Sequence, residues 1–197
     1  MEIDKKAMMA ELGGAFTVSL AVGFGAGNLE WAIALAVVWM AFGGAHVLPV
    51  VTWCHMLTSD LSDGEGNWAA NGMRLGAQIV GAILAILLGT HFGDIETGWA
   101  ATDMWITDIA DGYWAVISTI AVGAVWWQIH TRCDTPWVSA VGLMVLGGMM
   151  TLSGANEMAA SITSMGDGIV DTLVNWILDG AMVGLGALIG VKIDEAI

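Results

Sequence analysis

"FGGAHVLPVVTW", residues 42–53, is the stretch that decides how this 197-residue chain is expected to fold. It is mostly apolar, yet it contains a glycine pair, a histidine and the first of only two prolines. Continued to residue 57, it is too apolar for a hydrated loop and too short to cross a hydrocarbon core of about 30 Å. "SGANEMAASITSM", residues 153–165, has the same character. We expect both stretches to form re-entrant half-helices, which begin near Pro49 and near Met158.

The composition around these stretches is that of an integral membrane protein. Hydrophobic residues make up 57% of the chain, glycine occurs 27 times, and the mean hydropathy is +0.74. Apolar runs of near-spanning length predict transmembrane helices. Six candidate spans are expected, at residues 7–25, 29–43, 69–90, 113–130, 136–152 and 172–191. The sequence therefore predicts an all-α membrane protein with six transmembrane helices and two re-entrant half-helices.

The positions of the charged residues predict the orientation of the chain in the membrane. Lysine and arginine collect on the cytoplasmic flanks of spans. With six crossings and an inside N-terminus, all five cations fall on that side: Lys5, Lys6, Arg74, Arg132 and Lys192. Both termini are then cytoplasmic, and the acidic loop at about residues 91–112 is extracellular, most simply across a plasma membrane. The net charge of −14 comes from acids in hydrated loops, and nucleic acid is not an expected partner.

Tryptophan positions give a second indication of the two membrane interfaces. Trp99, Trp105 and Trp114 are expected at the outer interface, and the inner one is expected to hold Trp68, Trp126, Trp127 and Trp137.

The two halves of the chain carry a weak repeat. Gly44-Ala45-His46 recurs as Gly154-Ala155-Asn156, and each triplet follows a span and opens a short apolar segment. Three spans per half would invert the second half relative to the first. Broken helices that meet near the midplane are found in such inverted repeats, because irregular backbone is tolerated there when it lines a cavity. We expect a single membrane domain, residues 1–197, with halves at about 1–92 and 110–197.

The ordered segments "AELGGAFTVSLAVG", "IALAVVWMAF", "GGAHVLPVVT" and "GAQIVGAILAILLG" resemble the first half of aquaporins, the major intrinsic protein family. "SGANEMAAS" and "NWILDGAMVGLGALIG" resemble the second half more faintly. This resemblance implies half-helices that meet at a pore centre, and a homotetramer with one pore per subunit. It also implies that the partners are membrane lipid, further copies of the chain and a small neutral solute.

The departures from the family pattern concern the pore itself. Where aquaporins carry Asn-Pro-Ala, this chain has Leu48-Pro49-Val50 and Met158-Ala159-Ala160. A shift of two residues would instead place Asn156 at the second asparagine position. The filter arginine aligns with Ser161, while Leu146 and Ala155 align with other filter positions. Leu48 and Met158 are therefore expected to form an apolar gate at the pore centre, which discourages a file of water.

Three ionisable positions have two interpretations each. Glu11 is a family position, and it is expected to brace the re-entrant backbone or else to relay protons, whereas its counterpart in the fourth span is Ala115. His46 either braces the pore or acts as a pH gate. Glu157 either caps the second half-helix or lines an outer vestibule.

The expected function is passive transport of small neutral molecules such as water, a polyol, urea, ammonia or a gas. The alternative is a non-conducting, aquaporin-like structural or assembly subunit. No nucleophile with a base, no phosphate loop and no metal-ligand or cofactor pattern is found in the sequence, so neither an enzyme nor a cofactor is expected.

Overall fold

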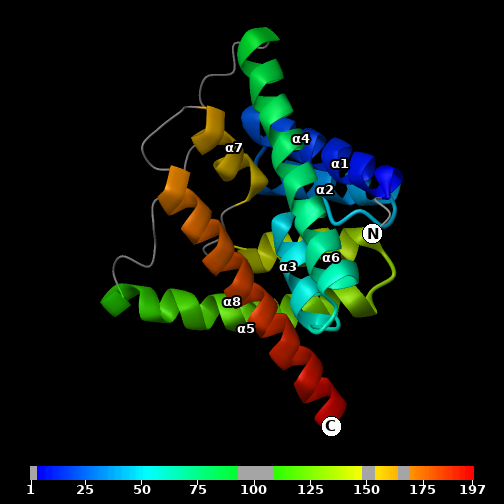
Figure 1. Ribbon diagram of the computed structural model, residues 1–197, viewed down its shortest axis with the longest axis vertical. Coiled ribbons are helices and arrows are strands. Elements are labelled where there is room, and N and C mark those ends of the chain that lie inside the picture. The colour runs from blue at the N-terminus through cyan, green and yellow to red at the C-terminus, as the bar shows by residue number, and fades with distance from the viewer. Residues whose placement is uncertain (1–3, 93–108, 148–153, 164–168) are drawn as a thin grey trace.

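The computed structural model of this protein describes residues 4–92, 109–147, 154–163 and 169–197 (Figure 1). These residues contain no β-strand and form eight α-helices with one short π-helical segment. The elements are α1 (Lys5–Gly23), α2 (Asn28–Ala41), α3 (Pro49–Thr58), η1 (Gly64–Ala69), α4 (Ala70–Phe92), α5 (Ile109–Arg132), α6 (Pro136–Gly147), α7 (Ala155–Thr163) and α8 (Ile169–Ala196). The predicted all-α class is confirmed. The predicted acidic loop lies mostly outside the described residues, together with Trp99 and Trp105.

Local sequence signals explain where the first helices begin and end. The Asp4 side chain accepts hydrogen bonds from the backbone N–H groups of Lys6 and Ala7, which is the usual way an N-cap aspartate starts a helix. The turn after α1 uses Gly25 at a φ of 72°, a conformation that glycine adopts without a steric penalty. The short helix α3 starts with Pro49 in its first turn, where the missing N–H needs no partner.

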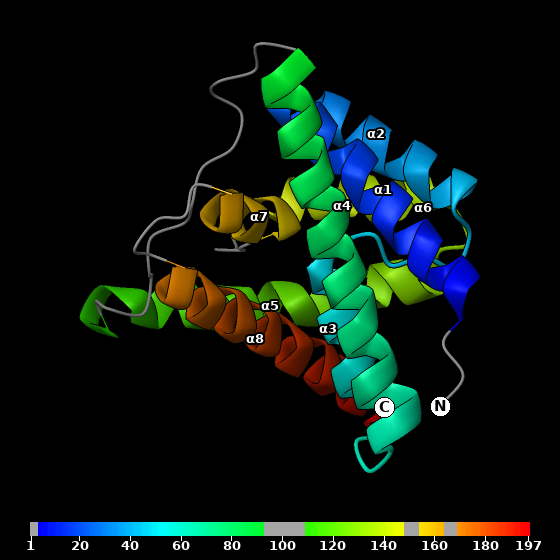
Figure 2. The same cartoon turned by 45° about the horizontal axis from the view of Figure 1, so that its top comes forward.

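The same contacts recur in the two halves of the chain. The α1–α4 and α5–α8 pairs have the most extensive helix contacts, and α2 packs against α6 between the halves. Each short helix packs against the last long helix of the opposite half, α3 against α8 and α7 against α4. Figures 1 and 2 show this exchange, with α7 beside α4 and α3 between α4 and α8. Each helix from α1 to α4 therefore has a counterpart from α5 to α8.

Glycine permits the close approach of the paired long helices. A Cβ atom on Gly81 of α4 would overlap the backbone carbonyl of Leu12 in α1. In the other pair, a Cβ atom on Gly186 of α8 would overlap the carbonyl of Ile120 in α5. Backbone atoms at these contacts cannot move aside as a flexible side chain can. Small residues at such crossings are typical of helix packing in membranes.

Large apolar side chains also cover outward faces of the helices. In the described part of the chain, two segments are long and apolar enough to cross a membrane, residues 64–91 and 172–196, while α2 and α6 are apolar but shorter. Two exposed stripes follow helical spacing. They consist of Leu29, Ile33, Val37 and Met40 on α2, and of Leu173, Ile177, Leu185, Ile189 and Ile193 on α8.

The main core lies between α2, α3, α5, α6 and α8, and it corrects one expectation. Trp126 and Trp127 are 0% and 6% exposed and belong to this core, so they are not interfacial anchors. Their indole rings pack where α5 meets α6. The Trp126 indole N–H donates a hydrogen bond to the Ser139 backbone carbonyl at 3.1 Å. Trp68, Trp114 and Trp137 are exposed, as anchors would be.

Candidate functional site

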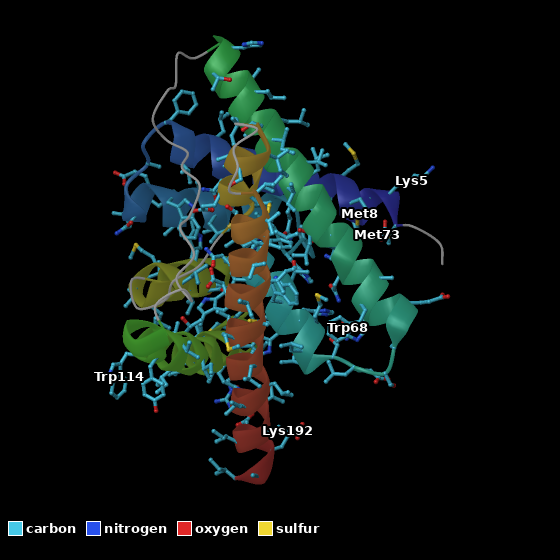
Figure 3. The ribbon with its side chains drawn as sticks, turned by 60° about the vertical axis from the view of Figure 1, so that its left-hand side comes forward. Lys5, Met8, Trp68, Met73, Trp114 and Lys192 are labelled. Carbon is cyan, nitrogen blue, oxygen red and sulfur yellow. The ribbon has the colours of Figure 1, made fainter. Side chains whose placement is uncertain are left out.

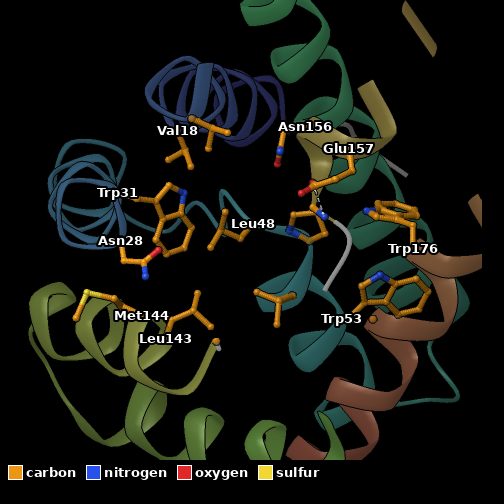
Figure 4. Close-up of a pocket in the computed structure, with 16 residues that line it drawn as sticks. Val18, Asn28, Trp31, Leu48, Trp53, Leu143, Met144, Asn156, Glu157 and Trp176 are labelled. Atoms are coloured by element: carbon orange, nitrogen blue, oxygen red, sulfur yellow. Dashed lines mark hydrogen bonds between the residues drawn. The ribbon is translucent and has the colours of Figure 1, made fainter. Parts of the chain in front are cut away.

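The first turns of the two short helices line the same cavity, which we name the Trp31 cavity. Its volume is about 420 Å³. Leu48, Pro49 and Val50 reach it from the start of α3, and Asn156 and Glu157 reach it from the start of α7. Figure 4 shows Asn28 and Trp31 on one side, Trp53 and Trp176 on the other, and Leu48 between them. The remaining wall includes Val18 of α1 and Leu143 of α6.

The start of α7 is held by its own acidic residue. Glu157 Oε2 accepts a hydrogen bond from the Gly154 backbone N–H at 2.8 Å (Figure 4). A carboxylate in the first turn also interacts favourably with the positive end of the helix dipole. The same side chain also lines the Trp31 cavity, so Glu157 both caps α7 and faces a cavity.

A second cavity, which we name the His130 cavity, has a volume of about 340 Å³. Its wall includes Trp39, His46, His130 and Ser139. The His130 ring stacks on Trp126, and its Nδ1 atom lies 2.5 Å from the Ser139 hydroxyl oxygen. His46 Nδ1 is 3.1 Å from the Thr52 hydroxyl oxygen, so both imidazoles are held by hydroxyl groups.

The two cavities lie in series along α2 and α6. Trp31 and Trp39 line one cavity each, and they are two helical turns apart on one face of α2, about 12 Å along its axis. Leu35 lies on the same face between them and is fully buried. On α6, Ser139 and Leu143 line one cavity each.

Buried apolar residues lie between the two cavities. Between α2 and α3, the chain passes from His46 in one cavity to Leu48 in the other through the buried Val47. On α6, Ala140 is fully buried next to Ser139. Leu35, Val47 and Ala140 belong to one core cluster, and we name these three residues the plug. A narrow apolar plug without hydrogen-bonding side chains opposes the passage of water.

Glu11 of α1 fixes the backbone that carries Val47, one of the three plug residues. Its carboxylate is fully buried and accepts from the backbone N–H groups of His46 at 2.6 Å and Val47 at 2.7 Å. It also accepts from Arg74 Nη1 at 2.7 Å and Gln78 Nε2 at 2.8 Å, both on α4. These are the backbone contacts that the bracing interpretation of Glu11 expects. Four donors and one full countercharge offset the cost of removing a carboxylate from water.

The brace holds a strained backbone. Val47 has a φ of 68°, and it is the one residue other than glycine with a positive φ in the described part of the chain. A β-branched residue rarely adopts this conformation, which costs on the order of 1–3 kcal/mol. The Glu11 contact at the Val47 N–H and the burial of its side chain keep the residue in place.

Met158 does not occupy the place that the ungapped alignment with aquaporins implies. It is 3% exposed and packs with Met56, Leu75 and Trp176, so it is absent from the described wall of the Trp31 cavity. The helix begins at Ala155, three residues before the expected start, which turns Met158 toward α4 and α8 and leaves Asn156 on the cavity wall. Met158 therefore does not face Leu48 across this cavity, as the expected gate requires.

The other residues of the second expected motif and of the outer filter are also buried or packed elsewhere. Ala159 and Ala155 lie in a cluster with Ala82 and Ile86, with Ala160 packed at its edge. Ser161 is buried and shares a 2.9 Å hydrogen bond with the Thr172 hydroxyl, which directs it toward α8. Leu146 packs against the main core. None of these positions belongs to the described wall of the Trp31 cavity.

Several site residues were missed in the sequence. The sequence indicates Arg74 only as an orientation signal, yet in the structure it pairs with Glu11. Its spacing of four residues from Gln78 places both side chains on one face of α4, and this signal could have indicated a shared partner. His46 and His55 have ring centroids 4.9 Å apart, a contact set by the turn between α2 and α3. Trp31 and Trp176 carry no sequence signal that distinguishes them from other tryptophans.

Comparison with protein-family models and with curated proteins identified no relative of this chain. The arrangement of the cavities, the plug and the brace is therefore the basis for inferring a function.

Proposed function

We propose that this protein is a passive transmembrane channel for small neutral solutes, closed at the plug in the described conformation. In this proposal α1, α2, α4, α5, α6 and α8 are six spans of an inverted repeat, and α3 and α7 are re-entrant half-helices. The recurring contacts of the two halves support the repeat. The shared cavity at the starts of α3 and α7 supports half-helices that meet end to end.

Exposed apolar surface and charge position support the membrane embedding. The stripes on α2 and α8 suit contact with lipid chains, because soluble monomers rarely expose continuous apolar faces of this kind. Figure 3 shows Lys5 and Trp68 on the opposite side of the molecule from Trp114. This separation fits a cytoplasmic end with the cations and an outer end near Trp114.

The observation that carries the proposal is the pair of cavities in series. The Trp31 cavity and the His130 cavity follow one another along α2 and α6, and the plug residues lie between them. Apolar walls with a few polar groups, such as Asn28 and Asn156, suit neutral solutes. The positive ends of α3 and α7 both meet the Trp31 cavity and disfavour cations. Water, a polyol, urea, ammonia and dissolved gas remain the candidate solutes.

The plug also supports a second candidate function, that of a non-conducting structural or assembly subunit. Leu35 and Ala140 are fully buried, and Val47 is 1% exposed. A protein without transport function could keep the fold and fill the path with apolar side chains. Homotetrameric assembly, which the aquaporin resemblance implies, would suit either function, and mass measurement in mild detergent tests it.

Osmotic and solute flux into proteoliposomes tests the channel proposal. Vesicles with the natural chain are compared with protein-free vesicles for water, glycerol, urea and ammonia. The channel predicts a faster volume change for at least one of these solutes. Rates equal to those of protein-free vesicles for all four would favour the structural subunit.

A further inference from the structure

A groove on the outside of the helix bundle adjoins the His130 cavity at Gly44 and Ala45 and shares no lining residue with the Trp31 cavity. It has a volume of about 770 Å³ and runs between α1, the turn after α2 and the start of α4. Met9, Leu12 and Phe42 supply an apolar wall, while Lys6 and Arg74 supply two cations. We name it the Lys6 groove. It combines apolar surface with positive charge, the two features that a phospholipid requires of a protein surface.

The charges at this groove differ from those elsewhere on the protein. The chain has 19 acidic residues and only five cations, Lys5 and Lys6 included. Arg132 pairs with Asp194, and Lys192 pairs with Glu195 at 2.7 Å. Lys5 and Lys6 are exposed and have no ion-pair partner within the described residues. The unpaired positive charge of an otherwise acidic protein thus gathers at one end of α1.

Arg74 and Asp4 complete the charged lining of the groove. Arg74 uses Nη1 for Glu11 and for the Gly44 carbonyl, and its side chain is still 23% exposed. A guanidinium has five N–H donors, so further donors remain for a ligand in the groove. Asp4 is the acidic residue in the wall, and its Oδ1 atom is used to cap α1.

We propose that the Lys6 groove binds an anionic phospholipid, with the phosphate at Lys6 and Arg74 and the acyl chains against Met9 and Leu12. The proposal rests on the membrane embedding proposed above and is independent of conduction. In the predicted orientation this end of α1 is cytoplasmic, where anionic lipids are enriched and attract basic residues next to spans. Lipid contact with apolar residues beside the phosphate distinguishes this site from one for free phosphate.

Lipid retention measured by native mass spectrometry in mild detergent tests this site. The natural chain is titrated with phosphatidylglycerol, with phosphatidylcholine and with inorganic phosphate. The expected result is preferential retention of phosphatidylglycerol, with no displacement of this lipid by inorganic phosphate. Equal retention of the two lipids, or displacement by phosphate alone, would overturn the proposal.

A matched pair of double variants locates the binding. Lys5→Gln with Lys6→Gln removes two unpaired cations, and Arg132→Gln with Lys192→Gln removes two paired ones. We expect the first variant to lose phosphatidylglycerol affinity on the order of twentyfold, since each basic residue near the surface contributes about fivefold. The second should stay within about twofold of the natural chain, because its cations are neutralised by acids.

Two results for this pair of variants would overturn the proposed lipid site. Equal losses in both variants would show nonspecific attraction, and no loss in either would show that the groove holds no such lipid. All four substituted side chains are exposed, so unfolding midpoints close to that of the natural chain are expected and serve as the folding control. Because lipid retention is the readout, failure here leaves the channel proposal standing, and absent flux leaves the lipid site standing.

Discussion

Glu11 is a single buried carboxylate on which three separate segments depend. Its partners lie in the turn before α3 and on α4, and it belongs to α1 itself. Removing its charge would leave Arg74 partly buried without a counterion, while one oxygen could still accept hydrogen bonds. This arrangement makes the turn that carries Val47 sensitive to a change of one atom.

We expect Glu11→Gln to lower the free energy of unfolding by about 3–5 kcal/mol, the usual cost of breaking a buried ion pair from one side. Thermal or denaturant unfolding in detergent measures the change. Glu195→Gln is the matched control, because its pair with Lys192 is exposed and contributes about 0–1 kcal/mol. Equal midpoints for the two variants would contradict the bracing role.

Val47 allows a test of backbone strain at one residue. At its φ of 68°, alanine would keep the strain and lose most of the packing, whereas glycine would lose slightly more packing and remove the strain. We expect Val47→Gly to be more stable than Val47→Ala by about 1 kcal/mol. At Val51, which is equally buried but lies inside α3, alanine should instead be better than glycine by about 1 kcal/mol. The same order at both positions in unfolding measurements would argue against strain at Val47.

At the scale of elements, the contacts between long helices depend on glycine where backbones meet. We expect Gly186→Ala to destabilise the fold by about 1–3 kcal/mol, because the added methyl overlaps the Ile120 carbonyl and separates α5 from α8. Gly76→Ala on α4 is the control, since its methyl would meet open space. There the change should be neutral or stabilising by up to about 1 kcal/mol. Similar thermal shifts for both substitutions would show that the α5–α8 contact tolerates a wider spacing.

The positions of the elements could be predicted from the sequence far better than the orientations of individual side chains. Apolar runs bounded by glycine and charge located all eight helices, and Pro49 marked the first residue of α3. The start of α7 has no proline to mark it, and the resemblance alone predicts a start near Met158. The helix begins three residues earlier, at Ala155, and Met158 packs in the core and not in the cavity. A helix turns by about 100° per residue, so a small error in its start changes which side chains face a cavity.

Contacts between residues that are distant in the sequence were the second feature that the sequence alone could not predict. The resemblance placed Glu11 near the re-entrant backbone, but the contribution of α4 through Arg74 and Gln78 depends on how α1 and α4 pack. The plug likewise depends on how the helices pack. Leu35, Val47 and Ala140 are ordinary apolar residues in the sequence, and they form a barrier only where α2, α6 and the turn before α3 meet.

Across the whole molecule, we propose that the Trp31 cavity and the His130 cavity are two parts of one path, closed by the plug. Shortening Leu35 should connect them, because it lies on the cavity-facing side of α2 between Trp31 and Trp39. Leu35→Ala also costs about 2–5 kcal/mol of stability, so vesicles must contain equal amounts of folded protein. Leu84→Ala removes the same atoms from an exposed position on α4 and is the matched control.

Osmotic shrinkage of proteoliposomes that contain the natural chain, Leu35→Ala or Leu84→Ala tests whether the two cavities form one path. We expect vesicles with Leu35→Ala to shrink several-fold faster than those with the natural chain, since a wider constriction wets more easily, and vesicles with Leu84→Ala to shrink at the natural rate. If Leu35→Ala, correctly folded and inserted, shrinks no faster than the natural chain, the plug does not lie on a solute path and the channel assignment is contradicted.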